Sequence, residues 1–194
     1  MTEIPERKPR GMLVYPRSAW RKLFMKMPLY YWRMGLGPVL QRWFLVLTTT
    51  GRKSGQPRHT MLEFSVMDGK TFLGSGWGER PDWCQNIAAD PRVTIQSSSG
   101  TQSAMARRVT SDEEMARLYH VAKARKSPVW KEYLASLGIE DTVEDYVAKK
   151  ERLVIFRLDP TSEKTPALMK TDLVWVWGVV LLVAWFAWWL LSRM

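Results

Sequence analysis

The chain is poor in the residues that build disulfide frameworks and most metal sites. Its 194 residues include one cysteine, Cys84, and two histidines, His59 and His120. A single cysteine excludes an intrachain disulfide and favours a cytosolic body. These three residues show none of the paired spacings of a zinc site, so we expect no bound metal. The start MTEIPERKPRG has no apolar core of secretory type, so we expect no signal peptide.

Acidic residues are scarce relative to basic ones. The chain has 19 Asp and Glu against 29 Lys and Arg, which gives a net charge of +10. Residues 1–53 hold eleven of these cations and only two acids, Glu3 and Glu6. Such an excess favours nucleic acid, anionic lipid or an acidic small molecule as a partner. Because no aromatic and basic RNA-binding motif is present, we expect no nucleic-acid partner.

Charge is missing altogether from residues 173–191, which read LVWVWGVVLLVAWFAWWLL. A helix of this length reaches about 28 Å, close to the hydrocarbon core of about 30 Å. Tryptophans lie near both of its ends, as in many membrane helices. The run therefore predicts a C-terminal transmembrane helix, with a buried core helix as the alternative. Cations precede the run and only Arg193 follows it, which predicts a cell-membrane protein with its body in the cytoplasm.

The segment 18–42 mixes large apolar residues with scattered cations, as helices on an anionic membrane surface do. Pro28, Gly35 and Pro38 are expected to break it into pieces. Packing of the same apolar residues on the body is the alternative, and the two can hold together. The chain divides into a mobile basic N-terminus (1–17), this amphipathic segment (18–42), a body (43–160), a polar linker (161–172) and the membrane helix (173–191).

Within the body, β-branched and aromatic runs predict six strands, at 43–50, 58–69, 70–76, 92–99, 101–110 and 152–159. Asp68-Gly69 and Ser99-Gly100 read as tight hairpin turns. Helices are expected near 82–89, 112–126, 128–137 and 140–150, the first two opened by capping boxes at Asp82 and Ser111. Strands joined mainly as hairpins predict an antiparallel barrel with flanking helices, an α+β fold.

The stretch 48–60, TTTGRKSGQPRHT, places three cations and five hydroxyls in a loop and the adjoining ends of two strands. Glycines relax the backbone there, so amide N–H groups and charged side chains can converge on one anion. This arrangement predicts a phosphate or carboxylate site, with a solvated basic hairpin as the alternative. The expected ligands are Arg52, Lys53, Ser54, Gly55 and Arg58.

A second stretch, GSGWGERPDWCQNIAADP at 74–91, combines small residues with an indole and a carboxamide. Trp83 and Asn86 lie three apart on one helix face. A backbone with small side chains, followed by an indole and a carboxamide, is suited to bind a flat ring that lies against the main chain. The glycine spacing does not match the dinucleotide fingerprint, and Trp83 as a core anchor fits equally well.

Together the two stretches resemble the deazaflavin-dependent nitroreductase family, which has a split β-barrel fold and uses coenzyme F-420. The resemblance runs from 44 to 109 and less closely to 159, and it leaves the C-terminal helix outside. It implies that residues 43–160 form a six-stranded split β-barrel that binds the deazaflavin. FMN and haem, which related barrels bind, remain alternatives.

The resemblance also implies roles for individual residues. The loop around Lys53 would hold the phosphate and acidic tail of the coenzyme, and the turn after Ser75 would lie near the deazaflavin ring. The implied cofactor-binding residues are Arg52, Lys53, Ser54, Gly55, Arg58, Ser75, Gly76, Trp77, Trp83 and Asn86. Trp77 departs from the family pattern. We expect its indole to narrow the pocket.

The reaction that the resemblance implies is hydride transfer from the reduced coenzyme to a quinone, an enone or a nitro compound. The predicted membrane helix indicates that this acceptor is lipid-like. Tyr119 and Tyr133 are candidate proton donors on the helices after the barrel, with Ser75 as a third catalytic candidate. Packed helix aromatics are the alternative for both tyrosines. A non-catalytic carrier of coenzyme or lipid is the rival function, and the oligomeric state is left open.

Overall fold

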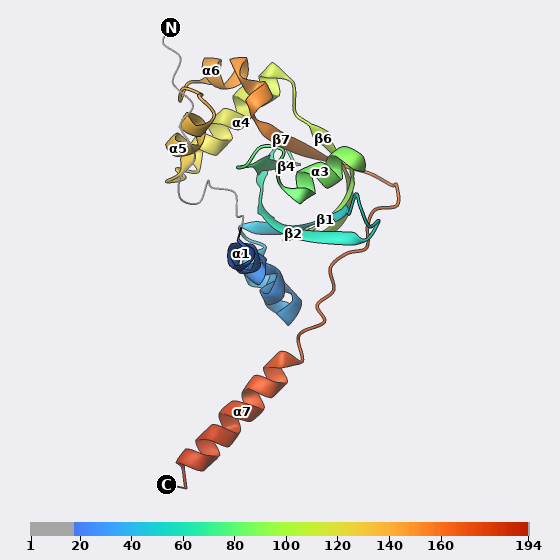
Figure 1. The fold of residues 1–194 in the computed structure, drawn as a ribbon, viewed down its shortest axis with the longest axis vertical. Helices are drawn as coiled ribbons and strands as arrows, with labels where there is room; N and C mark the ends of the chain where they lie inside the picture. Colours follow the sequence, from blue (N-terminus) through green and yellow to red (C-terminus); the bar gives the residue numbers. More distant parts are fainter. Residues whose placement is uncertain (1–17, 194) are drawn as a thin grey trace.

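The computed structural model describes residues 18–193, and the predicted mobile N-terminus at 1–17 lies outside them. Within these residues, seven strands form one antiparallel sheet in the order β2-β1-β5-β6-β7-β4-β3. The strands are β1 (Phe44–Thr50), β2 (Pro57–Glu63), β3 (Ser65–Met67), β4 (Lys70–Ser75), β5 (Arg92–Ser97), β6 (Gly100–Arg108) and β7 (Val154–Pro160). The sheet curls into an open barrel (Figure 1), which confirms the α+β class.

The predicted count of six strands is wrong, because the run at 58–69 divides into two strands. Its first part, β2, pairs with β1, with Glu63 opposite Phe44. Its second part, β3, pairs with β4, with Ser65 opposite Phe72. β2 and β3 are the two edge strands of the sheet. The bend at Phe64 therefore carries the chain from one edge to the other, and the barrel is nearly closed there.

The barrel interior is filled by alternate residues of the strands and is capped by helix α3 (Asp82–Ala89). Leu45 and Leu47 of β1 are fully buried in this core. Trp83 of α3 enters it and meets Phe156 edge to face, with 5.8 Å between the ring centroids. The helix span is as predicted, but its capping box is not, because Pro81 is the N-cap and Asp82 is already helical.

Three helices cover the outer face of β4 and β7, namely α4 (Asp112–Ala124), α5 (Trp130–Ser136) and α6 (Val143–Ala148), with a 3-10 turn at Lys150–Arg152. Their buried side chains, among them Met115 and Tyr146, form a second core with Ile155. At the predicted cap of α4, the Ser111 hydroxyl accepts a hydrogen bond from the Glu114 N–H. These helices support the aromatic cavity described below.

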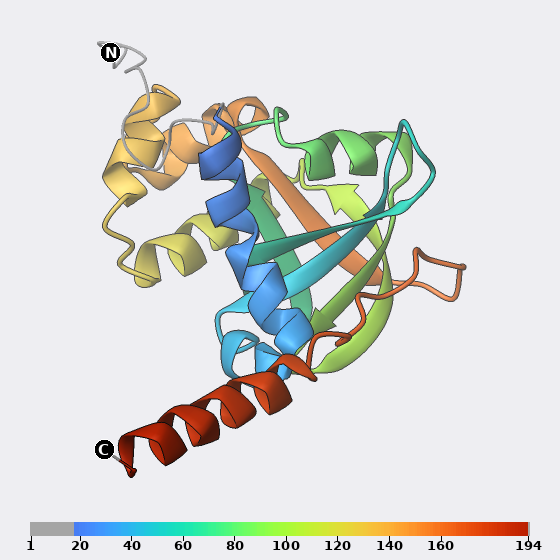
Figure 2. The ribbon, with the colours of Figure 1, turned by 60° about the horizontal axis from the view of Figure 1, so that its bottom comes forward.

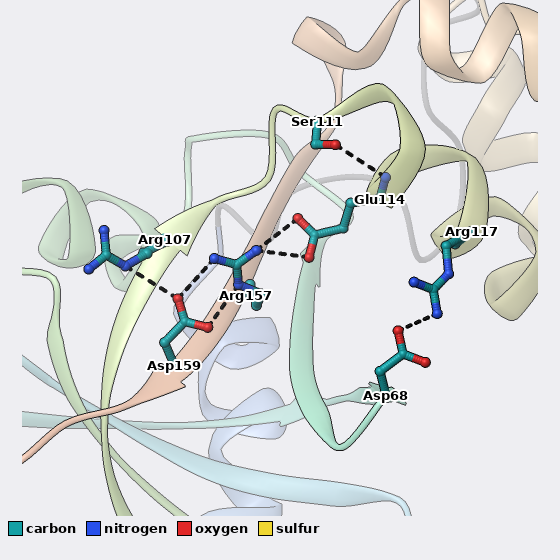
Figure 3. A network of polar contacts seen from close by, with 7 residues as sticks. All are labelled: Asp68, Arg107, Ser111, Glu114, Arg117, Arg157 and Asp159. Carbon is teal, nitrogen blue, oxygen red and sulfur yellow. Dashed lines mark hydrogen bonds and ion pairs between the residues drawn. The ribbon is translucent and has the colours of Figure 1, made fainter.

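An ion-pair network fastens α4 to the barrel (Figure 3). The Arg157 guanidinium of β7 binds the Glu114 carboxylate of α4 at 3.0 and 3.1 Å and the Asp159 carboxylate at 2.8 and 3.0 Å. Arg107 of β6 binds the same Asp159, at 3.2 Å. Farther along α4, Arg117 pairs with Asp68 in the β3–β4 turn. The helix is therefore held to the sheet at both places.

The segment 18–42 forms α1 (Ala19–Tyr31), a π-helical turn η2 (Trp32–Leu36) and α2 (Gly37–Leu40), which lie across β1 and β2 (Figure 2). The expected break at Pro28 is wrong, because the proline sits inside α1. The chain does kink at Gly35, whose φ is +89°. Trp32 is buried against Val46, so packing of the neighbouring residues offsets the backbone hydrogen bond that a proline removes.

Helix α7 (Val176–Leu191) projects from the body after an extended linker (Figures 1 and 2). The membrane span predicted at 173–191 needs correction. Regular helix begins only at Val176, because the residues before it form a turn. Sixteen helical residues rise about 24 Å. Among residues 18–193, none of the helices combines the length and the apolar character needed to cross a membrane.

Candidate functional site

The cationic loop between β1 and β2 is stabilised by hydrogen bonds within its own backbone. The Gly51 N–H donates to the Gln56 carbonyl at 2.8 Å, and the N–H groups of Ser54 and Gly55 donate to the Gly51 carbonyl. A Cβ at Gly51 would lie 2.9 Å from the Ser54 hydroxyl and 3.1 Å from the Gln56 carbonyl oxygen. Gly51 is therefore required by close packing, and Gly55 by its φ of +66°.

The loop differs from the expected backbone cradle. Besides the internal hydrogen bonds above, the Arg52 N–H donates to the Asn86 side chain at 3.2 Å, and the Gln56 N–H donates to the Ser54 hydroxyl at 3.3 Å. Because these amides are used within the protein, anion binding falls to the side chains. The Arg58 guanidinium reaches the same Ser54 hydroxyl, at 3.3 Å.

Helix α3 fixes the position of Arg52. The Asn86 carboxamide oxygen accepts from the Arg52 guanidinium at 3.2 Å, and its NH₂ group donates to the Thr49 hydroxyl at 3.0 Å. Asp82, one turn earlier on α3, pairs with the same guanidinium at 2.9 Å. Asn86 is buried, so its main role in this structure is to hold the loop against the helix.

These side chains line a cavity of about 750 Å³, which we call the cation cavity. It lies between α1–η2, the loop, β2, α3 and the linker after β7. Its acidic lining side chains are Asp82 and Asp172, and its cationic ones are Lys26, Arg33, Arg52, Lys53, Arg58 and Lys170. Lys53 and Arg58 form no ion pair with any residue of the described range 18–193, so the cavity holds a positive potential suited to a multiply charged anion.

Sequence reasoning missed the wall contributed by α1 and η2. Lys26, Tyr30 and Arg33 line the cavity together. Their spacing of four and seven residues places them on one helix face, and this pattern is visible in the sequence. The sequence predicts membrane contacts for the scattered cations of 18–42 and assigns none of them to the anion site, but Lys26 and Arg33 line the cavity beside the predicted anion loop.

A second cavity, of about 250 Å³, lies between β4 and the helices α4 and α5. We call it the aromatic cavity. Its lining is mostly apolar and includes Phe72, Leu118, Trp130, Tyr133, Tyr146 and Ile155. A volume near the lower end of ligand pockets suits a flat ring better than a bulky ligand.

The floor of the aromatic cavity is bare backbone. Gly74 and Gly76 both line it, and a Cβ built at either position would meet no atom within 4 Å. Side chains at these positions would therefore fill space that is open here. An open strand of this kind lets a planar ring approach the main chain closely, as the sequence predicted for the segment around Ser75.

Ser75 and Tyr133 meet in this cavity. The Ser75 hydroxyl donates to the Gly78 carbonyl at 2.6 Å and accepts from the Trp77 N–H at 3.3 Å. The Tyr133 hydroxyl donates to the Ser75 carbonyl at 3.4 Å. Burial raises the pKa of Tyr133 to about 12. The phenol therefore stays protonated at neutral pH and is a weaker acid than an exposed tyrosine.

The second tyrosine candidate lies elsewhere. Tyr119 is buried, and its hydroxyl donates to the Asp141 carboxylate at 2.9 Å and accepts from the Lys123 ammonium at 2.7 Å. The lining of the aromatic cavity does not include it. The geometry favours the structural reading of Tyr119, as a packed aromatic that joins α4 to the turn before α6.

The remaining predicted residues are divided. Trp83 and Asn86 border the cation cavity with Arg52, Lys53, Ser54 and Arg58, while Ser75 and Gly76 border the aromatic cavity. Trp83 is also part of the barrel core, as the core-anchor interpretation predicts. Gly55 and Trp77 lie outside both linings. Within residues 18–193, no group of three or more His, Cys, Asp and Glu could hold a metal ion.

The two cavities follow one another along β2. Thr60 borders the cation cavity and Glu63 borders the aromatic cavity. Three residues of strand correspond to about 10 Å. A molecule with an anionic tail and a flat ring could therefore place its two ends in two matching environments. The residues present fit such a ligand, with cations for the tail and glycine backbone with aromatic side chains for the ring.

Comparisons with known proteins show the family of the chain. The model of the family described as F420H(2)-dependent quinone reductase matches residues 31–143. The solved structure of an F420-H2 dependent reductase, FDR-A, is 25% identical and covers 61% of this chain and 95% of its own, with a TM-score of 0.45. A conserved hypothetical protein from Mycobacterium tuberculosis is 20% identical and covers 79% of this chain and 86% of its own, with a TM-score of 0.41.

Both TM-scores are below 0.5, so the assignment rests on the family match. The match includes both of the motifs that carried the resemblance, which is thereby confirmed, and it supports coenzyme F-420 over FMN and haem. Because the matched residues make up more than half of the chain, the protein belongs to this family of deazaflavin-dependent quinone reductases, which are oxidoreductases that use coenzyme F-420.

Proposed function

We propose that the protein uses reduced coenzyme F-420 to reduce an electron-poor acceptor held in a membrane. A quinone is the first candidate for this acceptor, and enones and nitro compounds are the others. The observation that carries the proposal is the succession of a cation cavity and an aromatic cavity along β2. One environment suits an acidic tail and the next suits planar rings.

In this proposal the cation cavity binds the coenzyme's phosphate and acidic tail. Lys53 and Arg58 are the primary contacts, because neither is paired with a carboxylate in the range 18–193. Arg52 is held by Asp82 and Asn86 and supplies a positioned guanidinium at the cavity wall. Charge-assisted hydrogen bonds of this kind are about twice as strong as neutral ones.

The aromatic cavity receives the reacting rings. The bound coenzyme supplies the hydride, and the protein supplies position and electrostatics. Gly74 and Gly76 leave room for a ring against β4. Trp130 and Tyr133 face the same space from α5, and the position of the Tyr133 hydroxyl in this cavity makes it our candidate to donate the proton that completes the reduction of a carbonyl acceptor.

The membrane part of the proposal rests on exposed apolar surface. Trp20 and Phe24 of α1 are 80% and 76% exposed. Helix α7 is exposed along most of its length, and its large exposed side chains include Trp185 and Phe186. Such surface is rare on monomeric soluble proteins. With a net charge of +10, an anionic lipid bilayer is the matching partner, and the single cysteine is in keeping with a body in the cytoplasm.

Two measurements test these parts separately. Reduced coenzyme bound to the protein is mixed with a soluble naphthoquinone, and oxidation of the coenzyme is followed by absorbance. We expect turnover faster than in the protein-free mixture, whereas protection of the reduced coenzyme would mean a carrier.

Sedimentation with vesicles tests the lipid. We expect binding to vesicles with anionic lipid, weaker binding to zwitterionic vesicles, and a large loss of binding when residues 176–194 are removed. Equal recovery in the vesicle pellet with and without α7 would contradict its role.

A further inference from the structure

The linker after β7 is an extended strap that returns past the sheet to α7 (Figures 1 and 2). Its residues 167–170 and 172 line the cation cavity. We define the C-terminal strap as residues 161–175. The Thr94 hydroxyl of β5 donates to the Pro166 carbonyl at 2.5 Å. Farther along, the Gln96 side chain donates to the Met169 carbonyl at 3.1 Å and accepts from the Met169 N–H at 2.9 Å. Met169 is buried against Trp32, so this part of the strap is firmly held.

The end of the strap is held differently, by an exposed ion pair. The Asp172 carboxylate accepts two hydrogen bonds from the Arg33 guanidinium, both at 2.7 Å. The two side chains remain 51% and 32% exposed. The turn into α7 is joined to η2 at the same place, where the Leu173 N–H donates to the Arg33 carbonyl at 3.0 Å and the Trp177 indole donates to the Met34 carbonyl at 2.8 Å.

Arg33 and Asp172 both line the cation cavity. Asp172 thus binds the Arg33 guanidinium in the bidentate geometry that a carboxylate of a ligand would also adopt. Ion pairs this exposed contribute little to stability. Carboxylates on an acidic tail, anchored nearby by Lys53 and Arg58, reach Arg33 at a high effective concentration and compete with Asp172 directly.

We propose that Arg33 is a further contact for the coenzyme's acidic tail, and that Asp172 occupies it until a tail carboxylate takes its place. The proposal rests on the function above, in which the cation cavity holds that tail. Asp172 lies outside the residues that match the family, so the competing carboxylate belongs to this chain's own strap. Replacement of Asp172 removes the ion pair alone, because the Leu173 and Trp177 hydrogen bonds still hold the turn before α7 and the Gln96 contacts hold the upstream strap.

This arrangement makes coenzyme affinity depend on tail length. A deazaflavin riboside without phosphate or tail has no group to compete for Arg33 and should be indifferent to Asp172. A coenzyme form with several tail carboxylates should be sensitive to both residues, with opposite signs. Removing Asp172 lifts the competition, whereas removing the Arg33 charge deletes the contact.

The experiment measures dissociation constants by deazaflavin fluorescence for the riboside and for coenzyme forms with short and long acidic tails. The variants are Asp172→Asn, Arg33→Gln and the double variant, in the full chain. Glu163→Gln is the matched control, because it removes one negative charge from the same strap at a residue outside the cavity lining. Asp172→Asn should tighten binding of the long-tailed form about three- to fivefold and leave riboside binding unchanged.

Arg33→Gln should weaken binding of the long-tailed form by a similar factor, and the double variant should lose the gain from Asp172→Asn. Misfolding does not produce tighter binding, so the Asp172 result is informative by itself. The inference is overturned if Asp172→Asn behaves like Glu163→Gln, or if it changes riboside affinity equally. Absence of binding by the unaltered protein to every deazaflavin form would instead overturn the proposed function, and this inference with it.

Discussion

Asn86 accepts hydrogen bonds from both the backbone N–H and the guanidinium of Arg52, each at 3.2 Å. One buried carboxamide on α3 therefore sets the position of the loop that carries the cations. The same side chain donates to Thr49 on β1, so helix, strand and loop are joined at one point. In the proposed function, Asn86 therefore affects anion binding mainly by positioning Arg52.

Replacing Asn86 with alanine should therefore affect both folding and binding. The Arg52 N–H loses its acceptor and the Thr49 hydroxyl loses one donor, and we expect the free energy of unfolding to fall by about 2 kcal/mol. Coenzyme binding should weaken because Arg52 is released. Urea unfolding measures the first effect and fluorescence titration the second. Asn86→Asp keeps the acceptor for Arg52 and should lose less stability, and equal stability of all three proteins would contradict this role.

Lys53→Glu tests the cation cavity with little effect on folding, because Lys53 is exposed and unpaired within residues 18–193. A carboxylate placed among the cations repels the acidic tail, and we expect coenzyme affinity to fall at least tenfold. Lys131→Glu is the matched control, since Lys131 is exposed on α5 and outside both cavity linings. Similar losses in the two variants would show that net charge alone matters.

Two tyrosine-to-phenylalanine changes separate the proton donor from a packed aromatic. Tyr133→Phe removes the hydroxyl in the aromatic cavity, and we expect kcat for a quinone to fall at least tenfold with coenzyme affinity nearly unchanged. Tyr119→Phe removes the hydroxyl bound to Asp141, and we expect a stability loss of about 1 to 2 kcal/mol with a much smaller effect on kcat. The reverse ranking of the two kcat values would identify Tyr119 as the donor.

Cys84 should be unreactive in the folded protein. Burial raises the pKa of its thiol to about 12, and its sulfur lies 3.6 Å from the Gly78 carbonyl oxygen. Because the thiolate is the reactive form, the ionised fraction at pH 8 falls to about one in ten thousand, against about one in ten at the usual pKa. Alkylation by iodoacetamide at pH 8, followed by mass spectrometry, should be slow in buffer and fast in urea. Equal rates would contradict the burial of this side chain.

The sequence predicted the barrel well because its signals are local. Continuous runs of apolar and β-branched residues mark strands such as β1, and the Asp68-Gly69 turn has the positive φ angles, 51° and 71°, that its residue types favour. The division at Phe64 was missed because β2 and β3 form one continuous β-rich run. Only pairing with β1 on one side and β4 on the other shows that two strands are present.

The sequence predicted the motifs of the candidate site but not the residues that surround them. The cations of the loop are adjacent in sequence, so the pattern GRKSG was enough to find them. Arg33 and Asp172 are 139 residues apart, and no local pattern joins them. Asn86 was predicted as a ligand, but its buried hydrogen bonds to Arg52 and Thr49 show a supporting role that spacing alone does not reveal.

The most direct test of the account is a fluorescence titration of the full chain in detergent with coenzyme F-420, with FMN and haem titrated in parallel. We predict saturable binding of the deazaflavin, strengthened by its acidic tail and weakened by salt, because cations line the cavity that receives it. Binding of FMN or haem without binding of coenzyme F-420 would contradict the account.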